Sequence, residues 1–239
     1  MIIDDNIVSN LKGYFNSEVD IPIRTIDSLN WNIPDSDKTK CAVNIVGPNG
    51  SGKSVLPSLF NFLDDKKYWV VNDKGDKILT VYPSLGWASV GIYRTKCGGC
   101  DSLVKDMIME AVYRLSLTNL NFLLEGSIVS NTKYTYWDIF RGINEKFQGI
   151  QPRKTMFILM DYPNQVYFDR VYQRNGGKEI NIECLSKKID AIRSYFQFYI
   201  DNAEEDGINV FVEKSEGLTN VINSVIHSIE SVLGVDIFK

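Results

Sequence analysis

Apolar residues along this chain are grouped in two ways, and the two groupings alternate. Continuous runs occupy 41–46, 121–127, 155–161 and 208–212, whereas apolar residues recur every three or four positions in 101–118, 136–147, 164–175, 183–202 and from Leu218 onward. Continuous runs are typical of strands buried on both faces, and the recurring pattern is typical of amphipathic helices. The alternation predicts an α/β protein of three layers, with a mainly parallel sheet between helices and ligands at the carboxyl ends of its strands.

Residues 68–93 interrupt this alternation. Two apolar runs, 68–71 and 77–81, flank a glycine-containing turn, and a third run, 88–93, follows. We therefore expect a β-hairpin insertion over 68–100, ahead of a helix at 101–118 that Asp101 or Ser102 caps. The chain before residue 41 is polar and turn-rich, with one short strand expected near 21–26. We interpret 1–40 as a lead-in and 41–239 as one domain.

The most specific signal is a glycine-rich segment directly after the run 41–46. It reads Gly47, Pro48, Asn49, Gly50, Ser51, Gly52, Lys53 and Ser54, and it matches G-x-x-x-x-G-K-[ST] at every fixed position. In such a P-loop the backbone N–H groups turn inward around a phosphate, the lysine reaches the β- and γ-phosphates, and the hydroxyl of the last residue can ligate Mg²⁺. The segment predicts a site for a nucleotide phosphate chain.

Pro57 lies only a few residues into the helix that this loop should open. A proline ring removes a backbone donor and crowds the preceding turn. We expect a kink or an irregularity at this position.

Length and composition limit the alternatives. The 239 residues are 44% apolar, enough for one sizeable core, and the formal charge of −4 gives no general attraction to nucleic acid or anionic membranes, although a local basic groove is compatible with it. We found no secretory signal or membrane-length apolar segment in the sequence, and four cysteines form no disulfide framework, so we expect a cytoplasmic protein. Cys97 and Cys100 have CxxC spacing, but without a second pair a tight Gly-Gly turn is the favoured interpretation.

Glu125 follows the apolar residues 122–124 near the end of the run 121–127, where a phosphate-binding protein needs an acid. It can hold Mg²⁺ through water or take a proton from the acceptor, and the sequence favours neither role. Arg170 and Arg174 are four residues apart on a predicted helix and share a face. With the glycine pair at 176–177 they suggest a lid over 164–182 that stabilises charge on a migrating phosphoryl group. We therefore expect Lys53, Glu125, Arg170 and Arg174 to be catalytic, and Ser54 and Glu125 to bind metal.

The segment 91–101 is the most individual part of the chain. It offers an aromatic ring, two cations, and glycines that allow close approach of the backbone. Our candidate acceptor-binding residues are Tyr93, Arg94, Lys96, Gly98, Gly99, Asp101 and Ser127. A hairpin end that leads into a capped helix explains the same segment equally well. The tryptophans at 69, 87 and 137 can stack a base, but core packing is the expected role of each.

The order of these parts resembles the small P-loop kinases of the nucleoside, nucleotide and thymidylate kinase type over about residues 40–235. The segments 93–101 and 124–130 are similar to those of bacteriophage P-loop kinases, a group that includes enzymes phosphorylating 5-hydroxymethyluracil within phage DNA. The resemblance implies a kinase that uses ATP and Mg²⁺, in the host cytoplasm if phage-encoded. Pro48, Asn49 and Ser54 depart from the usual thymidylate kinase loop, which disfavours free dTMP as the acceptor.

Three hypotheses follow from the sequence. The leading one is transfer of the γ-phosphate to a nucleotide-type acceptor, including a hydroxymethylated pyrimidine base in DNA. The second is an ABC-like or regulatory ATPase, because the P-loops of ABC-type ATPases favour this glycine-rich sequence. The absence of a Leu-Ser-Gly-Gly-Gln signature argues against this hypothesis. The third is a kinase-shaped toxin acting on a small metabolite or sugar nucleotide. The sequence does not indicate the oligomeric state.

Overall fold

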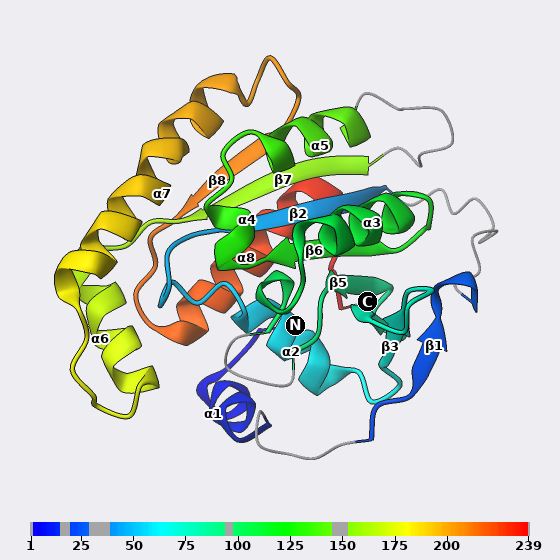
Figure 1. Cartoon of the computed structure of the whole chain (residues 1–239), viewed down its shortest axis with the longest axis horizontal. Helices are drawn as coiled ribbons and strands as arrows, with labels where there is room; N and C mark the ends of the chain where they lie inside the picture. Colours follow the sequence, from blue (N-terminus) through cyan, green and yellow to red (C-terminus); the bar gives the residue numbers. More distant parts are fainter. Residues whose placement is uncertain (1, 15–19, 29–38, 94–97, 145–152, 239) are drawn as a thin grey trace.

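One eight-stranded sheet runs through the computed structural model, which describes residues 2–14, 20–28, 39–93, 98–144 and 153–238 (Figure 1). The strand order is β1-β3-β4-β5-β6-β2-β7-β8. Only β3 with β4 and β4 with β5 pair antiparallel; the other five neighbouring pairs are parallel. The strands are β1 (Ile23–Thr25), β2 (Lys40–Val46), β3 (Tyr68–Val71), β4 (Lys77–Tyr82), β5 (Trp87–Val90), β6 (Asn121–Glu125), β7 (Arg153–Met160) and β8 (Asn209–Glu213). The predicted α/β class and mainly parallel sheet are confirmed.

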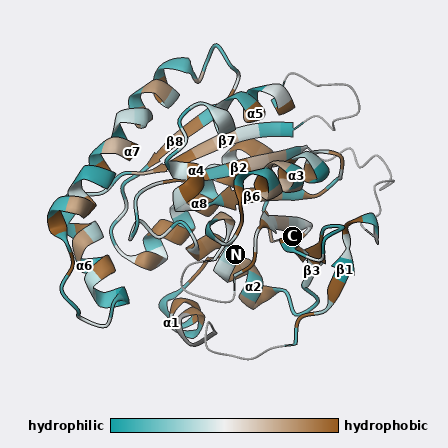
Figure 2. Ribbon diagram, viewed as in Figure 1, coloured by the Kyte–Doolittle hydropathy of each residue, from teal (hydrophilic) through white to brown (hydrophobic). Residues whose placement is uncertain are grey.

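Helices cover both faces of the sheet, and each face has its own apolar core. The α-helices are α1 (Asp5–Tyr14), α2 (Val55–Leu63), α3 (Lys105–Ser116), α4 (Ser127–Ser130), α5 (Thr135–Asn144), α6 (Asn164–Arg174), α7 (Ile182–Asn202) and α8 (Leu218–Leu233). Residues of α3 and α5 pack in one core, and residues of α1, α2 and α8 pack in the other. Figure 2 shows the resulting pattern, with apolar colour concentrated on the strands and on the sides of the helices that face them.

The register of β2 and β6 sets the position of the site. Ile45 of β2 pairs with Glu125 of β6, so the carboxyl ends of these two neighbouring strands lie at the same level. The glycine-rich loop follows β2, and α4 follows β6. Two segments about 80 residues apart in the chain therefore meet at one edge of the sheet.

The predicted strands at 68–71, 77–81 and 88–93 are confirmed with small shifts, and they continue the main sheet. The tryptophans at 69, 87 and 137 are all buried, which confirms core packing. Trp137, for example, stacks on Tyr199 and donates a hydrogen bond to Asp206 at 2.6 Å.

Two local predictions were wrong. The helix expected from 101 begins at Lys105, because Cys100–Ser102 forms a 3-10 turn and Leu103 is extended. Neither Asp101 nor Ser102 caps it, and its N-cap position is Val104. Pro57 causes no break, since α2 runs through it from Val55 to Leu63. It lies in the first turn, where a backbone N–H has no partner within the helix and its loss costs little.

The N-terminal helix α1 was not predicted. It packs against α2 and α8. Just before α1, the backbone of Ile3 forms two hydrogen bonds with the side chain of Asn223 in α8. Within the described ranges, none of the helices combines the length and the apolar character that crossing a bilayer requires.

Arg193 of α7 holds the connection between β7 and α6. Its guanidinium donates to Asp161 Oδ1 at 2.8 Å, to Asn164 Oδ1 at 2.5 Å and to the Tyr162 carbonyl oxygen. The Arg193 and Asp161 side chains are only 29% and 30% exposed. This cluster orients the start of the helix that carries Arg170 and Arg174.

Arg193→Ala should lower the free energy of unfolding by about 1–2 kcal/mol, since it removes charge-assisted hydrogen bonds from a half-buried cluster, and the melting temperature by roughly 3–6 °C. Thermal unfolding measures this. The control is Lys187→Ala, whose ion pair with Glu183 is largely exposed (75% and 79%) and should leave the melting temperature unchanged. Equal effects of the two substitutions would contradict the anchoring role.

Candidate active site

The glycine-rich loop 47–54 is fastened to α4 by two hydrogen bonds. The Gly47 N–H donates to Ser130 Oγ at 3.1 Å, and Ser127 Oγ donates to Asn49 Oδ1 at 2.6 Å. A side chain on Gly47 would come within 2.8 Å of Met160 Cβ, so this position accepts glycine alone. The loop is thus held between β7 and α4 in a defined shape.

Lys53 is buried at the centre of the loop, with 7% of its surface exposed. Its Nζ donates to the carbonyl oxygens of Gly47 and Pro48 at 2.7 and 2.9 Å. Burial lowers the pKa of Lys53, and the nearby Glu125 carboxylate opposes that shift. The Ser51 hydroxyl is buried without a hydrogen-bond partner among the described residues. A loop that holds a buried ammonium is suited to an anion such as a phosphate group.

Glu125 faces the loop from the end of β6. It is 1% exposed, and its Oε1 accepts a hydrogen bond from Ser54 Oγ at 3.1 Å. Burial raises the pKa of Glu125 to about 7; Lys53 opposes this shift and Asp101 adds to it. A carboxylate and a hydroxyl side by side are the hard oxygen ligands that Mg²⁺ prefers. This pair can hold a metal ion beside the loop.

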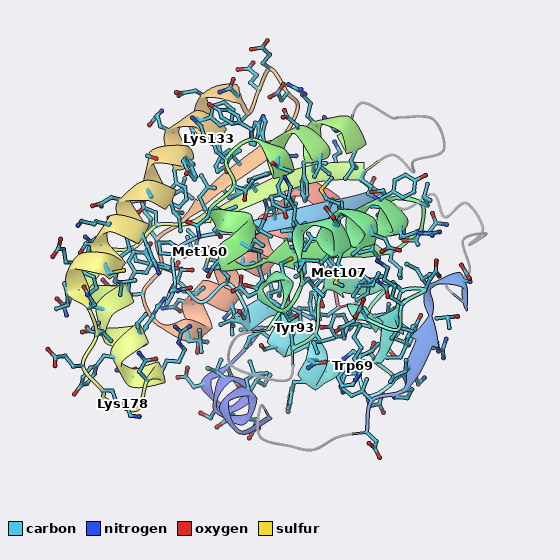
Figure 3. The ribbon with its side chains drawn as sticks, in the orientation of Figure 1. Trp69, Tyr93, Met107, Lys133, Met160 and Lys178 are labelled. Atoms are coloured by element: carbon cyan, nitrogen blue, oxygen red, sulfur yellow. The ribbon has the colours of Figure 1, made fainter. Side chains whose placement is uncertain are left out.

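Gly99 allows the segment after β5 to lie directly against Glu125. A Cβ at Gly99 would come within 2.4 Å of Glu125 Oε1 and 2.7 Å of Tyr93 Oη. The Tyr93 hydroxyl therefore lies beside the carboxyl group; burial, with a contribution from Glu125, raises the pKa of Tyr93 well above its usual value. Figure 3 shows Tyr93 near the middle of the molecule. Tyr93 is buried and does not line the cavity described below, so it supports Glu125 and does not face a ligand.

Asp101 brings a second carboxylate to the same place. Its Oδ1 accepts a hydrogen bond from the Ile128 N–H at 3.1 Å, which ties the 3-10 turn to α4. Gly126 makes this approach possible, because a Cβ there would come within 2.9 Å of Asp101 Oδ1 and 3.1 Å of Cys100 Cβ. Asp101 is exposed, in contrast to Glu125.

Helix α6 packs on the other side of the loop. A Cβ at Gly50 would lie 2.9 Å from the Tyr167 carbonyl oxygen, and Arg170 Nη1 donates to the carbonyl oxygens of Gly50 and Ser51 at 3.4 and 3.2 Å. Arg174, one turn later, lies close enough to Lys53 to help lower its pKa. Both arginines are thus beside the loop, as their spacing of four residues on one helix implies.

These groups open on a cavity of about 640 Å³. The predicted residues among its lining are Asn49, Gly50, Gly52, Lys53, Ser54, Gly98, Asp101, Glu125, Ser127, Arg170 and Arg174. The predicted residues Gly47, Pro48, Ser51, Tyr93 and Gly99 support the loop or Glu125 without lining the cavity. Most of the candidates, drawn from four separate segments of sequence, therefore share one site.

Part of the predicted acceptor segment, residues 94–97, is outside the described ranges. Arg94, Lys96 and Cys97 belong to this part. Cys100 is buried, and burial raises the pKa of its thiol well above the usual range. Among the described residues no group of three or more His, Cys, Asp or Glu side chains is arranged to bind a metal ion.

Five cavity-lining residues were not predicted: Leu11, Val55, Ser58, Gln173 and Leu218. Gln173 lies three residues after Arg170 on the same helix, a spacing that could have indicated it. The apolar spacing of Ile3, Ile7, Val8 and Leu11 is a helical signal that could have revealed α1. That α1 reaches the cavity depends on its tertiary packing and has no local signal.

Comparison with known proteins places the chain. The sequence model of the family described as 5-hmdU DNA kinase matches residues 37–220. The chain is 32% identical over 160 residues to 5-hmdU DNA kinase 1 of Salmonella phage ViI, an alignment that covers 64% of this chain and 68% of the relative. It is also 32% identical over 139 residues to the 5-hmdU DNA kinase of Bacillus phage SP10, covering 57% of this chain and 21% of that relative.

The chain belongs to the 5-hmdU DNA kinase family. It is therefore a kinase, an enzyme that transfers a phosphoryl group from a nucleotide donor. The predicted resemblance to phage kinases of this type is confirmed. Of the three hypotheses from the sequence, membership of this family favours the first. The matched region contains every predicted site residue, but it begins after α1 and ends at residue 220, within α8.

Gly99→Ala should inactivate this kinase without unfolding it. The new methyl group would displace the Glu125 carboxylate, the flexible end of a side chain, and a shift of about 1 Å at a catalytic group costs on the order of a hundred-fold in rate. Phosphoryl transfer and thermal unfolding are measured together. Gly75→Ala is the matched control: Gly75 also has a positive φ, of 83°, but a Cβ there meets nothing within 4 Å. Equal activity of the two variants would refute the steric argument.

Proposed function

We propose that this enzyme transfers the γ-phosphate of ATP, with Mg²⁺, to the hydroxymethyl oxygen of 5-hydroxymethyluracil in DNA. The observation that carries the proposal is the meeting of Lys53, Ser54 and Glu125 with Asp101 in one cavity. Membership of the 5-hmdU DNA kinase family supports this choice of acceptor. A base in a duplex must leave the stack before an enzyme can act on it, so we propose that the modified base enters the cavity from an unpaired strand or an opened duplex.

We further propose that the fold is of the P-loop NTPase kind. Strand β2, the loop 47–54 and helix α2 form a strand, turn and helix in the order that the motif requires, and β2 lies between two parallel neighbours. We also propose that residues 1–40 precede a kinase domain at 41–239, with 68–100 on the acceptor side. In this interpretation α6 and the following glycine pair form the lid at 164–182.

The donor side of the site would work mainly by positioning and charge. Backbone N–H groups of the loop would surround the phosphates, and Lys53 would neutralise charge between the β- and γ-phosphates. Arg170 and Arg174 would stabilise charge on the migrating group, because they flank the same loop from α6. Ser54 and Glu125 would hold Mg²⁺, which supplies charge neutralisation to the phosphates when bound; their contact at 3.1 Å fits this role.

The acceptor side would supply a base. We assign that role to Asp101, because Glu125 is already engaged with Ser54, and because one Asp101 oxygen bonds to Ile128 and leaves the other for a ligand. The hydroxymethyl oxygen would form a bond to the γ-phosphorus while its proton passes to Asp101. The bond from the γ-phosphorus to the bridging oxygen would break, and ADP would leave with that electron pair. Ser127, beside Asn49, would border the acceptor.

Lys53→Ala should abolish transfer, because it removes the charge that the loop provides to the phosphates. With wild-type enzyme, label from γ-labelled ATP should reach DNA that contains 5-hydroxymethyluracil and not the same DNA with thymine. The free hydroxymethyl nucleoside and nucleotide are tested for comparison. The control Lys154→Ala removes an exposed lysine of β7 and should retain activity. Label on free nucleotides alone, or full activity of Lys53→Ala, would contradict the proposal.

Two substitutions separate the roles of the carboxylates. Asp101→Asn should lower the transfer rate by about a hundred-fold to ten thousand-fold with little effect on ATP binding, as expected for a general base. Glu125→Gln should instead weaken Mg²⁺-dependent ATP binding by roughly ten-fold to a hundred-fold. Single-turnover transfer and calorimetric titration with ATP, with and without Mg²⁺, measure the two effects. The reverse pattern would assign the base to Glu125.

A further inference from the structure

One end of the active-site cavity is apolar, and the N-terminal helix builds part of it. Leu11 of α1, Val55 of α2 and Leu218 of α8 line the cavity, and α1 packs against both α2 and α8. Val55 directly follows Ser54, so the apolar wall begins where the phosphate-binding residues stop. The carboxylates Glu125 and Asp101 come instead from β6 and from the 3-10 turn after β5.

The wall is firmly attached to the body of the protein. The Ile3 N–H donates to Asn223 Oδ1 at 3.0 Å, and Asn223 Nδ2 donates back to the Ile3 carbonyl oxygen at 2.9 Å. Thr219 Oγ1 donates to Asp5 Oδ1 at 2.5 Å. Val8 and Leu11 are 6% and 3% exposed. They belong to the apolar core that also contains residues of α2 and α8. The core covers most of Leu11, and the part of its side chain that lines the cavity is held in a fixed position.

The chemistry of this end suits a flat aromatic ring. The lining of the cavity adds the planar amide of Gln173, from α6, to the aliphatic side chains of α1, α2 and α8. Apolar surface with a few polar groups is typical of sites for ring ligands. A nucleotide with its phosphates in the loop and its base past Val55 would bring its ring to this wall.

We propose that α1 forms part of the nucleobase site of the phosphate donor, with Leu11 and Leu218 in contact with the purine ring. This inference rests on the proposed function, in which ATP is the donor. It adds a segment of chain that lies outside the region shared with the family, because the match begins at residue 37. Leu11 then adds a contact from outside the shared region, whereas Leu218 and the phosphate-binding residues lie inside it.

The test compares a ligand that has a base with one that lacks it. Dissociation constants are measured for ATP and for inorganic tripolyphosphate, both with Mg²⁺, on the full chain. Leu11→Ala should weaken ATP binding about ten-fold and leave tripolyphosphate binding unchanged, because only ATP has a ring to contact the wall. Leu218→Ala, at the first residue of α8, should have the same selective effect and removes a side chain that is only partly buried.

Val8→Ala is the matched control. Val8 is buried in α1 beside Leu11 but does not line the cavity, so its substitution should cost similar stability and leave both ligands unaffected. Equal weakening of ATP and tripolyphosphate, or a change only in the KM for DNA, would overturn the inference. Lys53→Ala tests the proposed function separately, since it should weaken both ligands. Loss of both ligands in Lys53→Ala with no selective effect in Leu11→Ala would leave the proposed function intact and reject the role of α1.

Discussion

The buried Glu125 carboxylate, held against the Ser54 hydroxyl and near the Lys53 ammonium, is the interaction on which the site depends. Removing both charges from water is costly, and each group opposes, without cancelling, the pKa shift that burial causes in the other. The pairing of Ile45 with Glu125 in the sheet fixes their separation, since it aligns the ends of β2 and β6. The same alignment brings the loop 47–54 and α4 together, so the geometry of the site follows from the register of two parallel strands.

Close approach of backbone segments concentrates the second set of groups around this pair. Gly91 and Gly99 touch so tightly that a Cβ at Gly91 would lie 2.1 Å from the Gly99 carbonyl oxygen, and the two segments are joined by the bridge between Ile92 and Gly99. Gly126 allows an equally close approach of Asp101. Because side chains at these positions would push the segments apart, glycine is what lets two carboxylates occupy one small site.

One residue of the cavity lining, Leu11, comes from outside the region that matches the family. The phosphate-binding and carboxylate residues of the cavity lie within residues 37–220, the region that matches the 5-hmdU DNA kinase family. Leu11 lies before that region, on a helix joined to α8 by the exchange of hydrogen bonds between Ile3 and Asn223. A stable wall thus arises from two segments about 220 residues apart, each of which buries apolar residues in the core below the sheet. In our proposal, Leu11 adds a contact to the donor base from outside the region shared with the family.

The sequence by itself determined what depends on short-range order. The loop 47–54, the acid that ends β6, the paired arginines of α6 and the alternation of strands with helices all follow from local spacing, and the structure brings most of these residues to one cavity. Tertiary structure decided the rest. Whether Tyr93 faces a ligand or supports Glu125, whether Asp101 caps a helix or enters the site, and whether Leu11 reaches the cavity depend on contacts between distant segments. Local periodicity reports which face of an element is buried, but it cannot report which other element covers that face.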